Sequence, residues 1–186
     1  MFKRLIAALT ALSIAACLAA GASLLYPMKY DVIILINAEL RGLPPELVYA
    51  VIRAESRFDA GAVSKKEARG LMQLTRTTAD WAAEELRLND YTFDKIHDPE
   101  LNILIGCWYL WRLHKQFDGV AETALAAYNA GSGNVAKWLL TAENSSDGLT
   151  LRYIPFGETR IYVKKVKDNL KIYDLLFALR NLGGVE

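Results

Sequence analysis

Glu55 is the residue of this 186-residue chain with the clearest capacity for acid–base chemistry. It lies in the segment 44–58, which two leading prolines and apolar residues at three- and four-residue steps predict to be a helix. Val51 and Ile52 lie four and three residues before Glu55, so its side chain falls on the apolar face. Apolar surroundings raise the pKa of a carboxyl, which suits Glu55 to donate a proton near neutral pH. In the alternative interpretation, Glu55 lies at the edge of the apolar face, and its carboxylate reaches water or pairs with an arginine.

A loop with further motifs follows this helix. Residues 59–64 break the helical pattern, and Gly70 stands just before an apolar pair and an amide. The motifs, in chain order, are Glu55-Ser56-Arg57-Phe58, Ala62-Val63-Ser64, Ala68-Arg69-Gly70-Leu71-Met72-Gln73-Leu74, Ala126-Ala127-Tyr128-Asn129-Ala130-Gly131 and the run from Ile154 to Val163. In order and spacing they resemble the motifs of the soluble-lytic-transglycosylase (SLT) family, which cleaves bacterial peptidoglycan. The resemblance covers about residues 44–173, and several separate motifs in one order are a specific signal.

The resemblance implies that Glu55 acts first as general acid and then as base. The family cleaves the β-1,4 bond between N-acetylmuramic acid and N-acetylglucosamine and closes a 1,6-anhydro ring on the muramic residue, without a cofactor. Glycosidases normally use two carboxylates. Here Asp59 follows the helix too closely to face Glu55 across a sugar, and Glu84 and Glu85 are expected to be exposed. One carboxylate suffices when the nucleophile is a hydroxyl of the substrate itself.

Other matching residues are implied to bind the glycan strand. Ser56 and Ser64 would hydrogen-bond near the acid or the N-acetyl group. Met72 would form an apolar wall of the groove, and Gln73 would hydrogen-bond a sugar.

The later motifs supply a second group of implied glycan-binding residues. Tyr128 and Asn129 resemble the family's Tyr-Asn pair, although a buried tyrosine followed by a turn asparagine is an equal alternative. Glu158 would hold backbone or sugar polar groups, and capping of a helix N-terminus is an equal alternative for it. Tyr162 would contribute to the groove floor.

The periodicity predicts a mostly helical domain, and the resemblance implies the goose-type, lysozyme-like all-α fold with a glycan-binding groove. Residues 30–40 favour a helix, although residues 32–36 could also form a buried strand. The remaining expected helices are 44–58, 75–86, 100–117, 120–128, 135–140 and 161–182.

The N-terminal segment is strongly apolar. Residues 5–25 contain no charged side chain and follow Lys3 and Arg4. We expect residues 1–28 to be a single-pass membrane anchor because roughly 20 apolar residues span a bilayer. The alternatives are a cleaved signal peptide and a lipoprotein acylated at Cys17. All of them place the domain at 29–186 on the extracytoplasmic side of the cell membrane.

Composition excludes several classes of function. A net charge of +1 and 23% charged residues provide no basic field for nucleic acid. The only cysteines, Cys17 and Cys107, lie in different parts of the chain, so Cys107 is expected to be a small buried group. His97 and His114 have no partner at ligand spacing, so no metal site is expected.

Two other functions remain open at this point, and the sequence gives no protein partner. The first is a hydrolytic, lysozyme-type muramidase of the same fold. The second is a noncatalytic, membrane-tethered scaffold that binds the cell wall. An acid on an apolar face argues against the scaffold, since a binding module does not need one.

Overall fold

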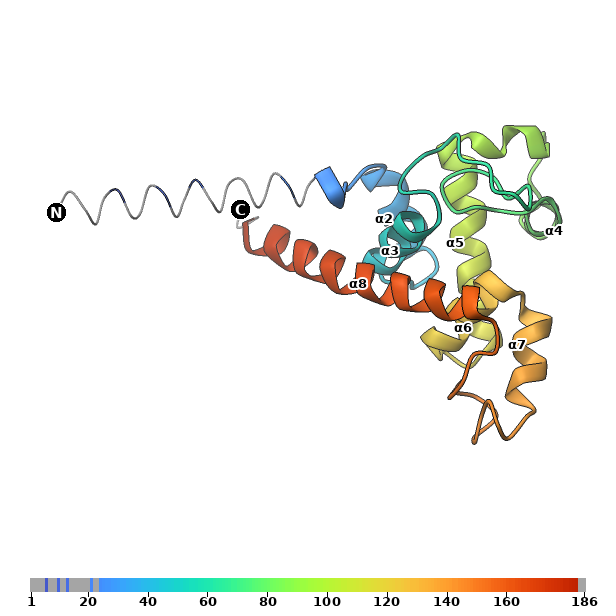
Figure 1. The fold of residues 1–186 in the computed structure, drawn as a ribbon. Coiled ribbons are helices and arrows are strands. Elements are labelled where there is room, and N and C mark those ends of the chain that lie inside the picture. The colour runs from blue at the N-terminus through green and yellow to red at the C-terminus, as the bar shows by residue number, and fades with distance from the viewer. Residues whose placement is uncertain (1–5, 7–9, 11–12, 14–20, 22–23, 184–186) are drawn as a thin grey trace.

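The computed structural model describes residues 6, 10, 13, 21 and 24–183. The elements in the described part of the chain are all helical (Figure 1), which confirms the predicted fold class. Two isolated backbone bridges, Val63 with Arg69 and Arg69 with Leu74, are the only strand-like pairings among these residues. The helices are α2 (Asp31–Glu39), α3 (Pro45–Glu55), α4 (Arg76–Glu85), the 3-10 helix η1 (Phe93–His97), α5 (Pro99–Gln116), α6 (Ala121–Ala130), α7 (Ser132–Leu139) and α8 (Gly157–Gly183).

The core forms around α3, which packs most extensively against α8 and also contacts α2. Tyr49 and Ile52 on α3 are fully buried, as is Tyr173 on α8. The rings of Tyr49 and Tyr173 lie 5.2 Å apart, so aromatic packing joins the two helices. Helix α5 contacts α2, α4 and α6, and α6 in turn contacts α7 and α8.

Helix ends follow the expected capping chemistry. Thr75 is the N-cap of α4 and accepts a hydrogen bond from the Thr78 backbone N–H at 3.3 Å. Asp98 caps α5 by accepting from the Leu101 N–H at 2.9 Å, with a proline at the first helical position.

The boundaries differ from the sequence prediction at several places. Residues 31–39 are a helix, so the strand alternative for residues 32–36 was wrong. Helix α8 begins four residues before its predicted start at 161, and α7 begins three residues before 135. Helix α3 ends at Glu55, three residues before the predicted end, because Arg57 and Phe58 adopt left-handed φ angles of 55° and 67°.

The predicted membrane anchor lies mostly outside the described residues. Among residues 6, 10, 13, 21 and 24–183, no helix combines the length and the apolar character that crossing a bilayer requires. Cys107 is a free, fully buried cysteine on α5, as predicted.

Candidate active site

Glu55 is the last residue of α3, at the point where the chain turns away from the helix. The turn is fixed by Phe58, which is buried and packs its ring 6.1 Å from that of Tyr49. The preceding carbonyl, that of Ala54, accepts a hydrogen bond from the Lys165 ammonium on α8. The end of α3 is therefore held from two sides, and the Glu55 carboxyl has a defined position.

Burial raises the pKa of Glu55 from 4.5 to about 7, because the protein surroundings disfavour the charged form. An interaction with the Tyr162 hydroxyl and the positive charge of Lys165 act in the opposite direction, and Glu158 adds a smaller upward effect. A carboxyl with a pKa of about 7 is partly protonated at neutral pH, so it can donate a proton and then accept one. The predicted chemical property of Glu55 is thus present in the structure.

Two tyrosines accompany this carboxyl, Tyr162, which is buried, and Tyr128, which is partly buried. The Tyr128 hydroxyl donates to the Met72 carbonyl at 2.9 Å, which joins α6 to the loop before α4. The Tyr162 hydroxyl makes no hydrogen bond of ordinary geometry within the described part of the chain, although it interacts with Glu55. Burial, with the nearby Glu55 charge, raises the pKa of both tyrosines, so both hydroxyls stay protonated and remain donors.

The carboxyl opens into a groove of about 440 Å³. One wall comes from the loop 61–75, and the other comes from the end of α6 and the start of α8. The residues lining it are Glu55, Ser64, Lys65, Lys66, Ala68, Gln73, Thr75, Tyr128, Asn129 and Glu158.

The loop wall is held by Asn102, a fully buried asparagine on α5. Its side-chain oxygen accepts from the Met72 N–H at 2.8 Å, and its amide nitrogen donates to the carbonyls of Arg69 at 3.1 Å and Ile96 at 2.8 Å. Gly70 has a φ of 79°, and a Cβ there would lie 2.2 Å from the Asn102 amide nitrogen. Only glycine lets the loop approach Asn102 this closely.

Gln73 presents its amide oxygen to the groove. Its amide nitrogen donates to the carbonyls of Ala62 at 3.2 Å and Gly70 at 2.9 Å. These two bonds use both amide hydrogens, so the oxygen is the group left to accept a hydrogen bond from a ligand. Ser64 lies on the same wall, where its hydroxyl accepts from the N–H groups of Lys66 and Ala68.

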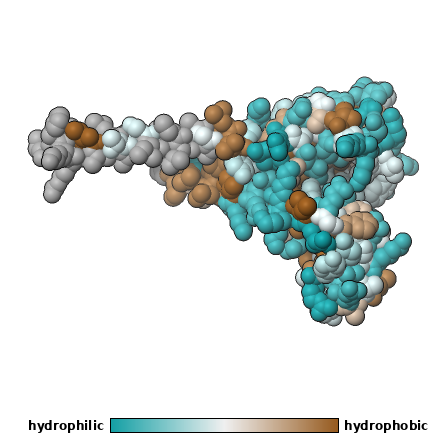
Figure 2. Space-filling view, viewed as in Figure 1, coloured by the Kyte–Doolittle hydropathy of each residue, from teal (hydrophilic) through white to brown (hydrophobic). Residues whose placement is uncertain are grey.

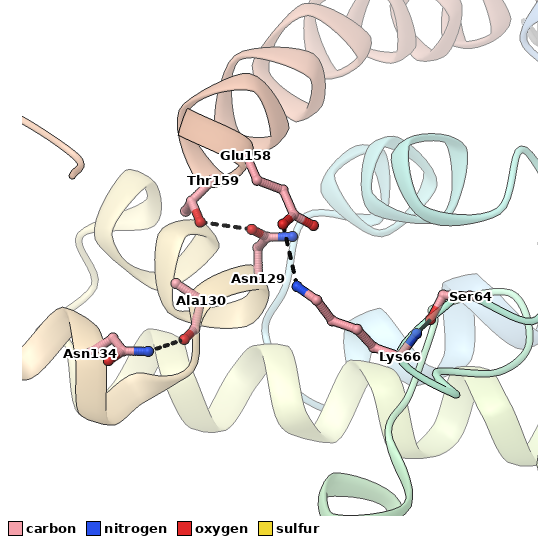
Figure 3. Close-up of polar contacts among 7 residues, drawn as sticks. All are labelled: Ser64, Lys66, Asn129, Ala130, Asn134, Glu158 and Thr159. Atoms are coloured by element: carbon pink, nitrogen blue, oxygen red, sulfur yellow. Dashed lines mark hydrogen bonds and ion pairs between the residues drawn. The ribbon is translucent and has the colours of Figure 1, made fainter. Parts of the chain in front are cut away.

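The side chains of the opposite wall bond to one another and, across the mouth of the groove, to the loop wall (Figure 3). The Thr159 hydroxyl donates to the Asn129 side-chain oxygen at 2.8 Å, which leaves the Asn129 amide nitrogen to donate elsewhere. Glu158 pairs with Lys66 from the loop wall at 3.3 Å, and both side chains are exposed. An exposed pair of this kind contributes little to stability, so a ligand that enters the groove can displace it.

The structure places six of the nine predicted site residues in the lining of the groove, and Met72, Ser56 and Tyr162 lie outside that lining. Met72 is fully buried, its side chain fills the space beside Gly106 on α5, and it does not line the groove. It therefore supports the groove from the core instead of forming an apolar wall. Ser56 lies outside the lining residues, and its hydroxyl donates to the Ile52 carbonyl at 3.4 Å. Tyr162 is buried beside Glu55.

Sequence reasoning missed two residues that build the site. Asn102 gave no sign of its role, because its partners are backbone groups of a loop about 30 residues earlier. Lys165 also gave no sign of its role, because its partner is the Ala54 carbonyl at the end of α3, far away in the sequence. Within the described part of the chain, no group of three His, Cys, Asp or Glu side chains could hold a metal ion.

A second hollow of about 420 Å³ lies between α6, α8 and the loop before α8. Its cations are partly neutralised within it, since Lys167 pairs with Glu122 at 2.6 Å and Lys164 pairs with Asp168. The carboxyl groups that line it, Glu122 and Asp168, are held in these two ion pairs. Glu55, whose pKa is raised by burial, lines the groove and not this hollow.

The fold and the site together define an all-α domain with one acid–base carboxyl at an open groove. The chain belongs to the Transglycosylase SLT domain family, which matches residues 33–150. It is 34% identical over 143 residues to the soluble lytic murein transglycosylase of Escherichia coli, covering 76% of this chain and 22% of that protein. It is 29% identical over 167 residues to membrane-bound lytic murein transglycosylase C of Yersinia pestis, covering 78% of this chain and 46% of that protein.

Solved structures agree with this assignment. The 70 kDa soluble lytic transglycosylase of Escherichia coli superposes with a TM-score of 0.77 at 30% identity, over 89% of this chain and 27% of that one. An inactive mutant of the lytic transglycosylase Slt from Pseudomonas aeruginosa gives a TM-score of 0.73 at 32% identity, over 82% and 25% of the two chains. The chain thus spans about a fifth to a half of the length of these relatives.

Proposed function

We propose that this chain is a peptidoglycan lytic transglycosylase in which Glu55 is the catalytic acid and base. The observation that carries the proposal is the Glu55 carboxyl, with a pKa of about 7, at a groove lined by sugar-binding types of side chain. Family membership and relatives named lytic murein transglycosylases support it. The Pseudomonas relative, described as inactive, has a glutamate replaced by glutamine, which fits a mechanism that needs one carboxyl.

The proposed reaction has two proton transfers. Protonated Glu55 gives its proton to the oxygen of the β-1,4 bond between N-acetylmuramic acid and N-acetylglucosamine, and the C1–O bond breaks. The C6 hydroxyl of the muramic residue then attacks C1, and the Glu55 carboxylate takes the hydroxyl proton. The product carries a 1,6-anhydro ring, no water is consumed, and Glu55 returns to its starting state.

The other groove residues have the polarity that binding of an N-acetylated sugar needs. The Gln73 oxygen can accept from a hydroxyl or an acetamido N–H, and the Asn129 amide nitrogen can donate. Tyr162 has a buried hydroxyl aimed at Glu55, and it can stabilise the carboxylate formed after the first proton transfer. We propose Ser64, Gln73, Tyr128, Asn129, Glu158 and Tyr162 as the substrate-binding set, with Ser56 supporting the end of α3.

Hydrolysis is the second candidate, because Glu158 also lines the groove. A second carboxylate could activate water and give a reducing end. Glu158 is exposed and paired with Lys66 at the groove mouth, which favours a binding role. The mass of the products separates the two reactions, since an anhydro end is one water lighter than a reducing end.

The test uses purified glycan strands and mass analysis of the products. We expect anhydro ends from the wild-type protein, and turnover reduced by about 10²- to 10⁴-fold in Glu55→Gln with binding retained. Glu158→Gln should still give anhydro ends. Reducing ends from the wild type would move the protein to the hydrolases, and an active Glu55→Gln variant would refute the assignment of Glu55. Binding without turnover by the wild type would indicate a noncatalytic scaffold.

We further propose that residues 1–28 attach the domain 29–186 to the cell membrane from its extracytoplasmic side. The uncharged stretch 5–25 behind Lys3 and Arg4 supports an anchor, and one relative is named membrane-bound. The expected result is a protein that stays with membranes after alkaline extraction and keeps its N-terminus. An acyl group on Cys17 would show a lipoprotein, and a chain that begins after the apolar stretch would show a cleaved signal.

A further inference from the structure

The last turns of α8 carry apolar side chains on the side that faces away from the core. Leu175, Leu179 and Leu182 are 60%, 55% and 76% exposed. Their spacing of four and three residues places them on one face of the helix, here called the terminal leucine stripe. The opposite face carries Tyr173 and Phe177, which are buried. A helix that packs by one face is expected to be polar on the other, and within the described part of the chain nothing covers the stripe.

The stripe lies at the pole of the molecule where the chain enters the domain. Tyr26 packs its ring 5.7 Å from that of Tyr173, and the Tyr173 hydroxyl donates to the Pro27 carbonyl at 3.2 Å. Arg180 pairs with Asp31 at 2.8 Å. In Figure 1 the last turns of α8 extend toward the end of the molecule at which the chain enters α2, and Figure 2 shows apolar surface gathered at this pole.

The chain entering at this pole is itself apolar. Leu24 and Leu25 are exposed, at 84% and 61%, and they end the uncharged stretch 5–25. Exposed cations flank the apolar surface, namely Lys29 beside the entry point and Lys171 one turn before Leu175. Apolar side chains with lysines beside them match the interface of an anionic bilayer, where lysine ammonium groups reach the headgroups.

We infer that the terminal leucine stripe of α8 docks on the surface of the membrane that holds the N-terminal segment. This inference rests on the proposed membrane attachment and adds a second point of contact to it. The stripe is small compared with the roughly 800 Å² per partner that a stable protein interface buries. A tethered domain needs much less, because attachment gives the stripe a high effective concentration at the bilayer. Two contacts, unlike one flexible tether, fix how the groove is oriented.

The experiment labels the full-length protein at the stripe. Leu179→Cys is coupled to a polar, environment-sensitive fluorophore and reconstituted into vesicles that contain anionic lipid and a lipid-borne quencher in the headgroup region. Cys107 is buried. The parent protein without the new cysteine, treated with the same fluorophore, is the blank for reaction at either native cysteine. Leu140→Cys is the matched control, because Leu140 is 86% exposed on a surface that the inference does not place at the membrane.

The expected result is blue-shifted, quenched emission from position 179 and unshifted, unquenched emission from position 140. Emission at position 179 as in water, from protein that floats with the vesicles, overturns the docking inference but leaves the attachment standing. A blue shift without lipid quenching that grows with protein density would indicate a second copy on the stripe and also overturn it. Protein that does not float overturns both the attachment and the docking, while the product assay still tests the proposed reaction separately.

Discussion

Replacing Glu55 by glutamine should make the folded domain more stable at neutral and alkaline pH, while abolishing its acid–base chemistry. The pKa of Glu55 is about 7 in the folded state, against 4.5 for an unperturbed carboxyl. Between these values the folded chain holds a proton that the unfolded chain has lost. The free energy of unfolding of the wild type therefore falls as the pH rises from about 4.5 to about 7, and this effect is constant above that range.

The size of the effect follows from the same two pKa values. One pKa unit corresponds to about 1.4 kcal/mol, so ionised Glu55 reduces the free energy of unfolding by about 3 kcal/mol at most. The side chain is partly exposed at the groove, and solvent reduces the figure below this limit. Glutamine has nearly the same shape and carries no charge at any pH, so ionisation at position 55 does not reduce the free energy of unfolding of the variant.

Urea unfolding at a series of pH values from 4 to 9 measures the difference between the two proteins. We expect Glu55→Gln to gain on the wild type as the pH rises through the range 4.5 to 7, and the difference to stay level above it. Glu84→Gln removes one negative charge from the exposed surface of α4 and serves as the control. A difference between Glu55→Gln and the wild type that does not change with pH would refute the raised pKa and the reasoning built on it.

The remaining predictions concern the groups that support the groove. Asn102→Asp keeps the acceptor for the Met72 N–H but cannot donate to two buried carbonyls, so urea unfolding should show a loss of roughly 3 kcal/mol; an unchanged midpoint would contradict the network. Gly106→Ala places a Cβ 2.2 Å from the Met72 sulfur and should cost roughly 1–3 kcal/mol. Met72→Ala alone should reduce the free energy of unfolding by roughly 2–5 kcal/mol. The double variant Gly106→Ala/Met72→Ala should lose less than the sum of the two single losses, whereas strict additivity would argue against contact between the two residues. Lys165→Met removes a charge that lowers the pKa of Glu55, so the fall of kcat/KM on the alkaline side should move to higher pH, and Lys165→Arg should restore it if charge is the cause.

The position of Glu55 could be predicted because it depends on local pattern. The apolar steps of α3 and its leading prolines lie within one segment, and they determine both the helix and the face that carries the acid. The end of α3 could not be predicted in the same way. Arg57 and Phe58 leave the helix because Phe58 packs against Tyr49, and this tertiary contact overrides local propensity.

The predicted groove residues also divide into those placed by local sequence and those placed by tertiary contacts. Gln73 and Asn129 lie in loop or helix-end positions whose polar side chains reach the groove. Met72 is adjacent to Gln73 in the chain, yet it points into the core because Gly106 on α5 leaves a space that the thioether fills. The sequence of the loop contains no sign of that space. Asn102 and Lys165 act on backbone carbonyls of distant segments, and such contacts leave no pattern in the sequence.

Helix α8 has a mechanical consequence, because one unbroken helix carries groove residues at its start and exposed leucines at its end. From Glu158 to Leu182 it rises about 36 Å, at 1.5 Å per residue. A rigid rod of that length acts as a lever, so a small tilt at the leucine end becomes a displacement of several ångströms at Glu158. The length of α8 also determines the distance between its leucine end and Glu158. Inserting seven residues, two turns, into the last third of α8 would increase this distance by about 10 Å and would leave the side chains on nearly the same faces of the helix. Under the proposed docking, the height of Glu55 above the membrane would then be set by the length of one helix.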